Sequence, residues 1–356
     1  MVRIEYNSFI MKNSSLIIHK SKLEMNIQCI LDELPDGCSL IPVLKDNAFG
    51  LGIKNIYPFF GNCYKMIAVS HVSEGTELRE LGYNGELLLL GGLTSEMLPE
   101  ALEADLTLSV FSPGLISVLP DRTKVQLFFN TGLNRAGIEA DEVDAVIDEL
   151  RDSSVCVTGA YSHEGNFELF LSLVKRFEDA GICIPMKHYC DSAMFENHPE
   201  YALDAVRFGR RLYMDAPDNF NPDIEEVASW RAYVIEVRHR KKNDLLGYNG
   251  SLRLKADADI ALISIGYGDG LNLELVKQNA PVLINGRRCP ILCTFMDQAL
   301  VDVTGLDCQC GEEVTLFGYD RSGLLLPSRE LAAMVDDEGV LLYSQISQRV
   351  ERKISE

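Results

Sequence analysis

Short apolar runs alternate with longer amphipathic segments through the first two-thirds of the chain. The apolar runs predict buried strands, and the segments between them, such as 141–150 and 166–180, have the three-to-four-residue spacing of a helix. The predicted strands lie at residues 39–44, 66–70, 86–90, 106–110, 125–129, 155–162, 184–189 and 205–208. Eight strand–helix units in about 200 residues predict a (β/α)8 barrel, a fold that carries its chemistry at the carboxyl ends of its strands.

The pattern changes after Trp230, where apolar runs are separated by turns with little helix between them. These runs lie at residues 231–239, 259–268, 280–292, 298–305 and 312–318. Strands in close succession predict a separate, mostly-β domain. We therefore expect an α/β protein with a TIM-type barrel at 1–225 and a β domain at 226–356, joined through the polar stretch at 218–226.

Composition narrows the range of functions. The 356 residues are 47% hydrophobic and 24% charged, and the formal charge of −20 disfavours nucleic acid and anionic membrane surfaces as partners. The basic stretch at 238–244 reads as an exposed loop. The sequence has neither an apolar run of about 20 residues nor the apolar core of a signal peptide, which predicts a cytoplasmic protein. Its ten cysteines are scattered, so we expect reduced thiols and no metal.

Polar side chains stand where several predicted barrel strands end. Lys45 follows the first strand in the stretch LIPVLKDNAFGLG, and later strand ends carry Arg135, His163, Ser192 and Arg207. A lysine that closes a strand can simply extend to water. Because the ends of parallel barrel strands meet at one rim, however, these groups are expected to converge there. Clustered cations would bind an anion, and a deprotonated lysine amine is a nucleophile for carbonyl groups.

The same residues lie in stretches that resemble the alanine racemase family. VLKDNAFGLG, NTGLNRAG and VRFGRRLYMDAP are similar to the family's barrel motifs, and LISIGYGDG, VLINGRRCPILCTFMDQALVDVTG and EEVTLFG are similar to those of its β domain. The resemblance covers nearly the whole chain. It implies pyridoxal phosphate as cofactor, a homodimer, and racemisation of alanine to yield a D-amino acid. A racemase for serine or another amino acid, and a catalytically weak cofactor-binding homologue, are the alternatives.

The resemblance also implies which residues act on protons. Lys45 would bind the cofactor covalently and serve as one base, and Tyr248, in LLGYNG, would serve as the opposite base from the partner subunit. Racemisation removes a proton from one face of Cα and returns one to the other, so it needs two groups on opposite sides. Arg207 would face the pyridine nitrogen and hydrogen-bond to His163, while Arg135 would approach the cofactor phenolate and the substrate carboxylate.

Further matched positions would bind the phosphate and the substrate. Ser192 with the backbone of Gly209 and Arg210 would hold the phosphate group. The amide of Met296 would bind the substrate carboxylate, and Tyr267 would line the entry channel. Ile346 is a second matched channel residue.

Several positions depart from the family pattern. Phe49 and Gln348 stand where phosphate-binding tyrosines are usual, which predicts looser cofactor binding because each missing hydroxyl removes about 1 kcal/mol. Phe128 replaces a lysine that pairs with the arginine at position 135. Glu168 replaces a channel aspartate, and 271–273 lacks the arginine that normally pairs with it. We expect these changes to affect which substrate is accepted more than the type of reaction.

Overall fold

The computed structural model describes residues 14–214, 221–336 and 339–355. The chain divides into two compact units: Asn26–Leu212 forms one, and the described residues before Asn26 and after Leu212 form the other. The predicted domain boundary between residues 225 and 226 stays a prediction. Residues 218–220 of the predicted connecting stretch lie outside the described residues.

Eight parallel strands form the Asn26–Leu212 unit. They are β2 (Ser39–Pro42), β3 (Met66–Val69), β4 (Glu86–Leu89), β5 (Leu106–Val110), β6 (Lys124–Phe128), β7 (Cys156–Tyr161), β8 (Lys187–His188) and β9 (Ala205–Phe208). Strands β3 to β8 pair in sequence order, and β2 pairs with β9. Two single bridges, Val43 to Ala68 and Asp191 to Arg207, join these sheets at both edges. The strands thus close into the predicted barrel.

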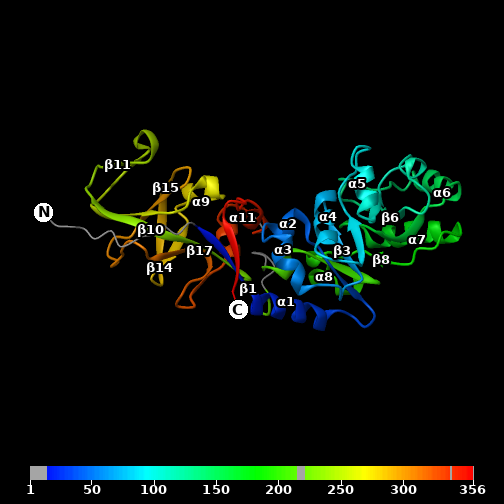
Figure 1. The fold of residues 1–356 in the computed structure, drawn as a ribbon, viewed down its shortest axis with the longest axis horizontal. Helices are drawn as coiled ribbons and strands as arrows, with labels where there is room; N and C mark the ends of the chain where they lie inside the picture. Colours follow the sequence, from blue (N-terminus) through cyan, green and yellow to red (C-terminus); the bar gives the residue numbers. More distant parts are fainter. Residues whose placement is uncertain (1–13, 215–220, 337–338, 356) are drawn as a thin grey trace. The chain divides into compact units, whose positions relative to one another are not determined.

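Short helices follow the barrel strands (Figure 1). After α1 (Lys20–Glu33), the helices are α2 (Lys45–Phe49), α3 (Ile53–Ile56), α4 (Val72–Glu80), α5 (Leu98–Glu103), α6 (Val143–Arg151), α7 (Phe167–Asp179) and α8 (Ser192–Asn197), with 3-10 turns η1 (Tyr57–Phe59), η2 (Ile116–Val118), η3 (Pro199–Tyr201) and η4 (Arg210–Leu212). The two helices predicted explicitly, 141–150 and 166–180, correspond to α6 and α7. Asn166 caps α7 by accepting a hydrogen bond from the Leu169 amide.

Strand β8 is shorter than the predicted 184–189. Pro185 lies inside the predicted range and has no N–H to donate to a neighbouring strand. Pairing therefore begins only at Lys187, which is opposite Ala160 of β7.

Aromatic rings stack across three neighbouring strands of the barrel. Phe128 of β6 is opposite Tyr161 of β7, which is opposite His188 of β8. The Phe128 and Tyr161 rings lie 4.6 Å apart and nearly parallel, and the Tyr161 and His188 rings lie 5.1 Å apart and nearly parallel. The three side chains are buried, so they fix the width of this part of the barrel.

The second unit is built on a nine-stranded, largely antiparallel sheet, as predicted for a β domain. Its order is β18-β17-β14-β15-β16-β13-β10-β1-β19. The strands are β1 (Ser15–His19), β10 (Ala228–Arg240), β13 (Ala258–Ile263), β14 (Pro281–Ile284), β15 (Arg287–Thr294), β16 (Ala299–Asp302), β17 (Glu313–Tyr319), β18 (Leu325–Leu326) and β19 (Glu351–Ser355). Strands β1 and β19, from opposite ends of the sequence, pair in parallel, and sequence analysis assigned neither.

Smaller elements complete this unit. They are the hairpin β11 (Leu245–Leu246) and β12 (Leu252–Arg253), the helices α9 (Leu273–Lys277), α10 (Ser328–Ala333) and α11 (Val340–Ser344), and the 3-10 turns η5 (Tyr248–Gly250) and η6 (Tyr267–Asp269). No described helix is both long enough and apolar enough to cross a lipid bilayer.

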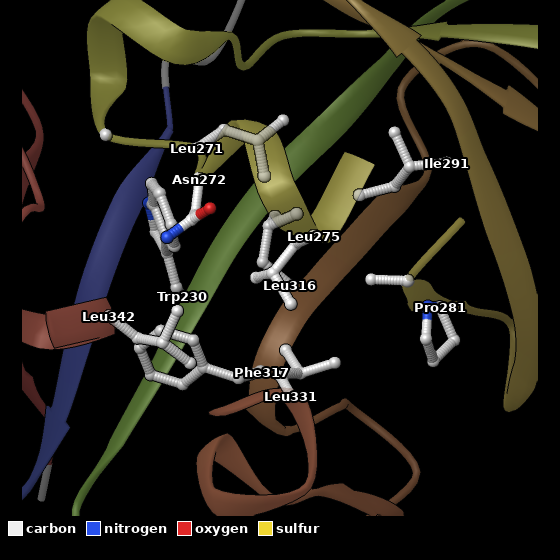
Figure 2. Close-up of a pocket in the computed structure, with 12 residues that line it drawn as sticks. Trp230, Leu271, Asn272, Leu275, Pro281, Ile291, Leu316, Phe317, Leu331 and Leu342 are labelled. Atoms are coloured by element: carbon white, nitrogen blue, oxygen red, sulfur yellow. The ribbon is translucent and has the colours of Figure 1, made fainter. Parts of the chain in front are cut away.

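The second unit contains a small cavity between its sheet and helices (Figure 2). Trp230, Leu275 and Leu316 line it together with other mostly apolar residues, and its volume is about 20 Å³. That volume holds one water molecule at most. It is too small to bind an amino acid.

Candidate active site

Lys45 is held at the barrel rim by an unusual backbone turn. The four residues after it, Asp46 to Phe49, have φ between 52° and 54°, although none is glycine. Left-handed conformation costs about 1–2 kcal/mol for each such residue. Two hydrogen bonds of 2.8 Å close the turn, from the Gly50 amide to the Asp46 carbonyl and from the Gly52 amide to the Asn47 carbonyl.

A buried carboxylate anchors this turn to the next strand–helix unit. Glu74 of α4 accepts hydrogen bonds from the backbone amides of Asn47, Ser70 and His71, at 2.9, 2.9 and 3.0 Å. The left-handed turn is thus fixed against the loop after β3. Backbone strain held in place by surrounding contacts is typical of functional sites, and here it sets where Lys45 leaves the barrel.

Positive charges from three strand ends lie around His163. Burial lowers the pKa of His163 to about 4, and the charge of Arg207 adds most to this effect among its neighbours, followed by those of Arg135 and Lys45, while Asp191 opposes it. Its Nδ1 is 3.6 Å from a carboxylate oxygen of Asp191. The structure therefore brings Lys45, Arg135, His163 and Arg207 within electrostatic range at one rim, and it keeps the imidazole neutral at pH 7.

Arg207 is buried and firmly held. Its Nη1 donates to Nδ1 of His188 at 2.6 Å and to the His188 carbonyl at 3.0 Å, and its Nη2 donates to the carbonyls of Ser162 and Tyr189 at 2.6 and 3.0 Å. The predicted hydrogen bond between His163 and Arg207 is therefore wrong within the described part of the chain. His188 makes it instead, because β8 lies beside β9, whereas His163 lies beyond the end of β7 and pairs with Asp191.

Sequence analysis missed His188. It opens the same HYCDS stretch that supplied Ser192, so the signal was an inward-facing histidine inside a predicted barrel strand. Because only the ends of predicted strands were searched for candidate residues, His188 was not selected.

The residues expected to hold a phosphate lie together. The Gly209 amide donates to the Ser192 hydroxyl at 3.3 Å, and the Phe49 ring packs so closely on Gly209 that a Cβ there would lie 2.7 Å from ring atom Cζ. Nζ of Lys45 is 5.9 Å from the centre of the Phe49 ring. Arg210 follows directly in η4. Ser192, Gly209 and Phe49 thus pack against one another beside Lys45.

The other departures from the family pattern also have clear places. Phe128 is buried in the aromatic stack inside the barrel. The positive charge that a lysine would carry at this position is therefore absent. Glu168 is exposed in the first turn of α7.

The remaining predicted residues belong to the second unit. Tyr248 is 61% exposed, and its ring meets that of Phe295 edge-on at 5.1 Å. The Tyr267 amide donates to the Phe295 carbonyl, and the Met296 side chain beside it is 56% exposed. Tyr248, Tyr267, Phe295 and Met296 thus form an aromatic patch on this unit. Two further predicted positions differ in exposure, Gln348 being exposed and Ile346 buried.

A possible ligand set for a cation occurs at the barrel rim. Ligand atoms of His163, Glu164 and Asp191 all lie within 4.8 Å of one another. The three cationic side chains around His163 would repel a divalent ion at this place, so the electrostatics favour an anion.

Comparison with known proteins shows to which family the chain belongs. The model of the alanine racemase N-terminal domain matches residues 18–217, and that of the alanine racemase C-terminal domain matches residues 227–354. The chain belongs to the alanine racemase family. Members of this family are isomerases that depend on pyridoxal phosphate.

Alanine racemases of several bacteria show how far the similarity extends. The chain is 27% identical to alanine racemase 2 of Caldanaerobacter subterraneus, with 94% of this chain and 95% of that protein covered. The solved alanine racemase of Clostridium difficile 630 has a TM-score of 0.88 at 22% identity, with 97% and 96% covered. That of Bartonella henselae, solved with covalently bound pyridoxal phosphate, has a TM-score of 0.84 at 21% identity, with 97% and 100% covered. The whole family architecture is present in this chain.

Proposed function

We propose that this chain is a pyridoxal phosphate-dependent racemase that interconverts L- and D-alanine. The observation that supports this function best is Lys45, anchored on a strained turn at the rim where Arg135, His163 and Arg207 converge. A reactive amine in a cationic site suits a cofactor that carries an aldehyde and a phosphate.

The residues present fit this cofactor. Lys45 would bind it covalently, and Ser192, the Gly209 amide and the Arg210 backbone would hold the phosphate. The two Nη groups of Arg207 donate all four of its hydrogen bonds. No described residue accepts a hydrogen bond from its Nε–H. This N–H would face the pyridine nitrogen. When bound, the cofactor supplies an electron-withdrawing ring that stabilises negative charge at the substrate Cα.

The protein's own groups would then move the proton. Lys45 takes or returns it on one face of Cα, and Tyr248 of the partner subunit does so on the other. Arg207 stays protonated, so it donates to the ring nitrogen without transferring a proton to it. Arg135 orients the substrate carboxylate. By leaving the ring nitrogen unprotonated, Arg207 would favour reprotonation of Cα over side reactions.

The aromatic patch supports a homodimer with shared sites. Tyr248 and Met296 are more than half exposed, and Phe295 also lines a hollow of about 380 Å³ over strands β10, β13 and β16. Apolar and aromatic groups concentrated beside such a hollow are typical of an interface. A second copy of this chain is the occupant that we propose, because it would bring Tyr248 to a barrel site in which the proposed mechanism assigns only one base, Lys45.

Deuterium exchange at Cα tests the function directly. Protein reconstituted with pyridoxal phosphate is incubated in deuterated water with a panel of amino acids, and exchange and racemisation are followed by mass spectrometry and chiral chromatography. We expect both for alanine, from either enantiomer. Exchange with serine but not alanine would show that the substrate is wrong, and no exchange with any amino acid would identify a catalytically weak homologue.

Restoring a tyrosine at position 49 should tighten cofactor binding. In Phe49→Tyr the new hydroxyl extends from Cζ, the atom that lies against Gly209, and adds a donor to the phosphate. We expect the dissociation constant of pyridoxal phosphate to fall by about three- to tenfold, which corresponds to one hydrogen bond to a charged acceptor. Absorbance titration of the cofactor-free protein measures this constant. Phe49→Leu, which adds no hydroxyl, is the control, and unchanged affinity in Phe49→Tyr would place the phosphate elsewhere.

A further inference from the structure

A chain of buried hydrogen bonds extends from Arg207 into the barrel. Nη1 of Arg207 meets Nδ1 of His188 at 2.6 Å, and Nε2 of His188 meets Oε1 of Gln126 at 2.7 Å. Gln126 and His188 are fully buried, and Arg207 is 4% exposed. The three side chains come from strands β6, β8 and β9.

The donor at one end of this chain and the acceptor at the other together fix the direction of every bond in it. A guanidinium can only donate, so Nδ1 of His188 must accept from Arg207. An imidazole whose Nδ1 accepts carries its proton on Nε2, and this N–H needs an acceptor. The side-chain oxygen of Gln126 is that acceptor. Burial and the charge of Arg207 hold the pKa of His188 well below its usual range, which keeps the ring neutral.

The surroundings hold the Gln126 amide and the His188 ring in place. The Gln126 amide nitrogen lies 3.8 Å from the sulfur of Met66, a weak acceptor, so the oxygen faces His188. Gly159 of β7 leaves room for the amide, because a Cβ there would lie 3.1 Å from the Gln126 nitrogen. Tyr161 stacks on the His188 ring and fixes its plane.

We propose that Gln126 is a positioning residue that locks His188 in its neutral Nε2–H tautomer and thereby holds the Arg207 guanidinium in its working orientation. The lock is a property of the barrel itself. Its effect on catalysis rests on the proposed function, in which Arg207 faces the cofactor. Without the Gln126 oxygen, the buried Nε2–H of His188 would have no acceptor, and the proton would move to Nδ1 or the ring would turn. The proton shift places two donors face to face, and the ring rotation moves Nδ1 away, so either change breaks the bond to Arg207.

Nitrogen NMR of the cofactor-free protein tests the lock without any catalytic readout. In protein labelled with ¹⁵N-histidine, two-bond ¹H–¹⁵N spectra distinguish a protonated from an unprotonated ring nitrogen, and His188→Asn assigns the signals. We expect a protonated Nε2 and an unprotonated Nδ1 at neutral pH. In Gln126→Leu this pattern should reverse or average. An unchanged His188 pattern in Gln126→Leu would overturn the proposal.

Two further variants keep the test decisive. Gln126→Glu retains an acceptor oxygen, so it should preserve the wild-type pattern even if Gln126→Leu fails to fold, and a shift to Nδ1–H in Gln126→Glu would also refute the lock. Thr107→Val removes a different side-chain hydrogen bond of the barrel, from the hydroxyl of buried Thr107 to Glu86 at 2.9 Å, and is the matched control, expected to leave the His188 pattern unchanged.

Kinetics of the reconstituted enzyme then separate the lock from the proposed function. Gln126→Leu should lower kcat for alanine racemisation about tenfold with little change in KM, because the loss of one oriented hydrogen bond acts on the reacting complex. A wild-type kcat in a variant whose tautomer has shifted would show that the lock does not serve catalysis. A shifted tautomer with no racemisation even by the wild-type protein would leave the lock standing and refute the function.

Discussion

Replacement of Lys45 with alanine is expected to abolish both covalent cofactor binding and racemisation. The variant loses the only group that the proposed function assigns to attack on the cofactor carbonyl, and it loses one of the two bases. General acid–base catalysis alone contributes about 10²–10⁴-fold, so we expect kcat to fall at least about a thousandfold. Absorbance in the visible range of desalted, reconstituted protein measures the covalent bond, and chiral chromatography measures the rate.

Two further lysine variants make this result specific. Lys45→Arg keeps a positive charge at the rim but has no amine that can form the bond, so it should fail like the alanine variant. Lys54→Ala removes an exposed lysine of α3 and should retain both colour and rate. If Lys45→Ala still held the cofactor covalently after desalting, another residue would be the attachment point.

The sequence alone predicted the barrel strands well, because strands buried on both faces read as continuous apolar runs. Their locations at 66–70 and 205–208, for example, match β3 and β9 closely. The pairing of β1 with β19 was not predictable in this way. It joins the two ends of the chain, and no local pattern in the sequence records a partner so distant.

The site was predictable to the extent that it lies at strand ends. That rule selected Lys45, Arg135, His163 and Arg207, which the structure brings within range of one another. It could not find His188, because the predicted strand 184–189 continued past this residue, whereas β8 ends at His188. The sequence does not show which residues a histidine in a barrel strand will contact, so its hydrogen bonds emerge only from the fold.

The left-handed turn after Lys45 was also invisible in the sequence. Positive φ is normally signalled by glycine or asparagine, but Asp46, Ala48 and Phe49 share it here. The conformation is imposed by tertiary contacts, above all by Glu74, which lies in the next strand–helix unit. Tertiary contacts thus override local propensity at the residue position that matters most for the proposed chemistry.

Replacement of Tyr248 with phenylalanine is expected to stop racemisation but to leave proton exchange at one face of the substrate Cα. The variant keeps the edge-on ring contact with Phe295 but lacks the hydroxyl that serves as the second base. We expect racemisation to fall at least about a hundredfold. Cα exchange with solvent deuterium should persist for one enantiomer, the one whose proton faces Lys45. Loss of exchange from both enantiomers, or an unchanged rate of racemisation, would contradict the two-base mechanism.

Mixing two inactive variants tests whether the site is shared between subunits. In a mixed dimer of Lys45→Ala and Tyr248→Phe, a shared arrangement combines the intact Lys45 of one chain with the intact Tyr248 of the other at one of the two sites. Random exchange of subunits makes about half of the dimers mixed, so activity should recover to about a quarter of the wild-type value. If each chain supplied both bases to its own site, every site would keep one defect and no activity would return. The control is Tyr248→Phe protein taken alone through the same subunit-exchange procedure, and it should remain inactive.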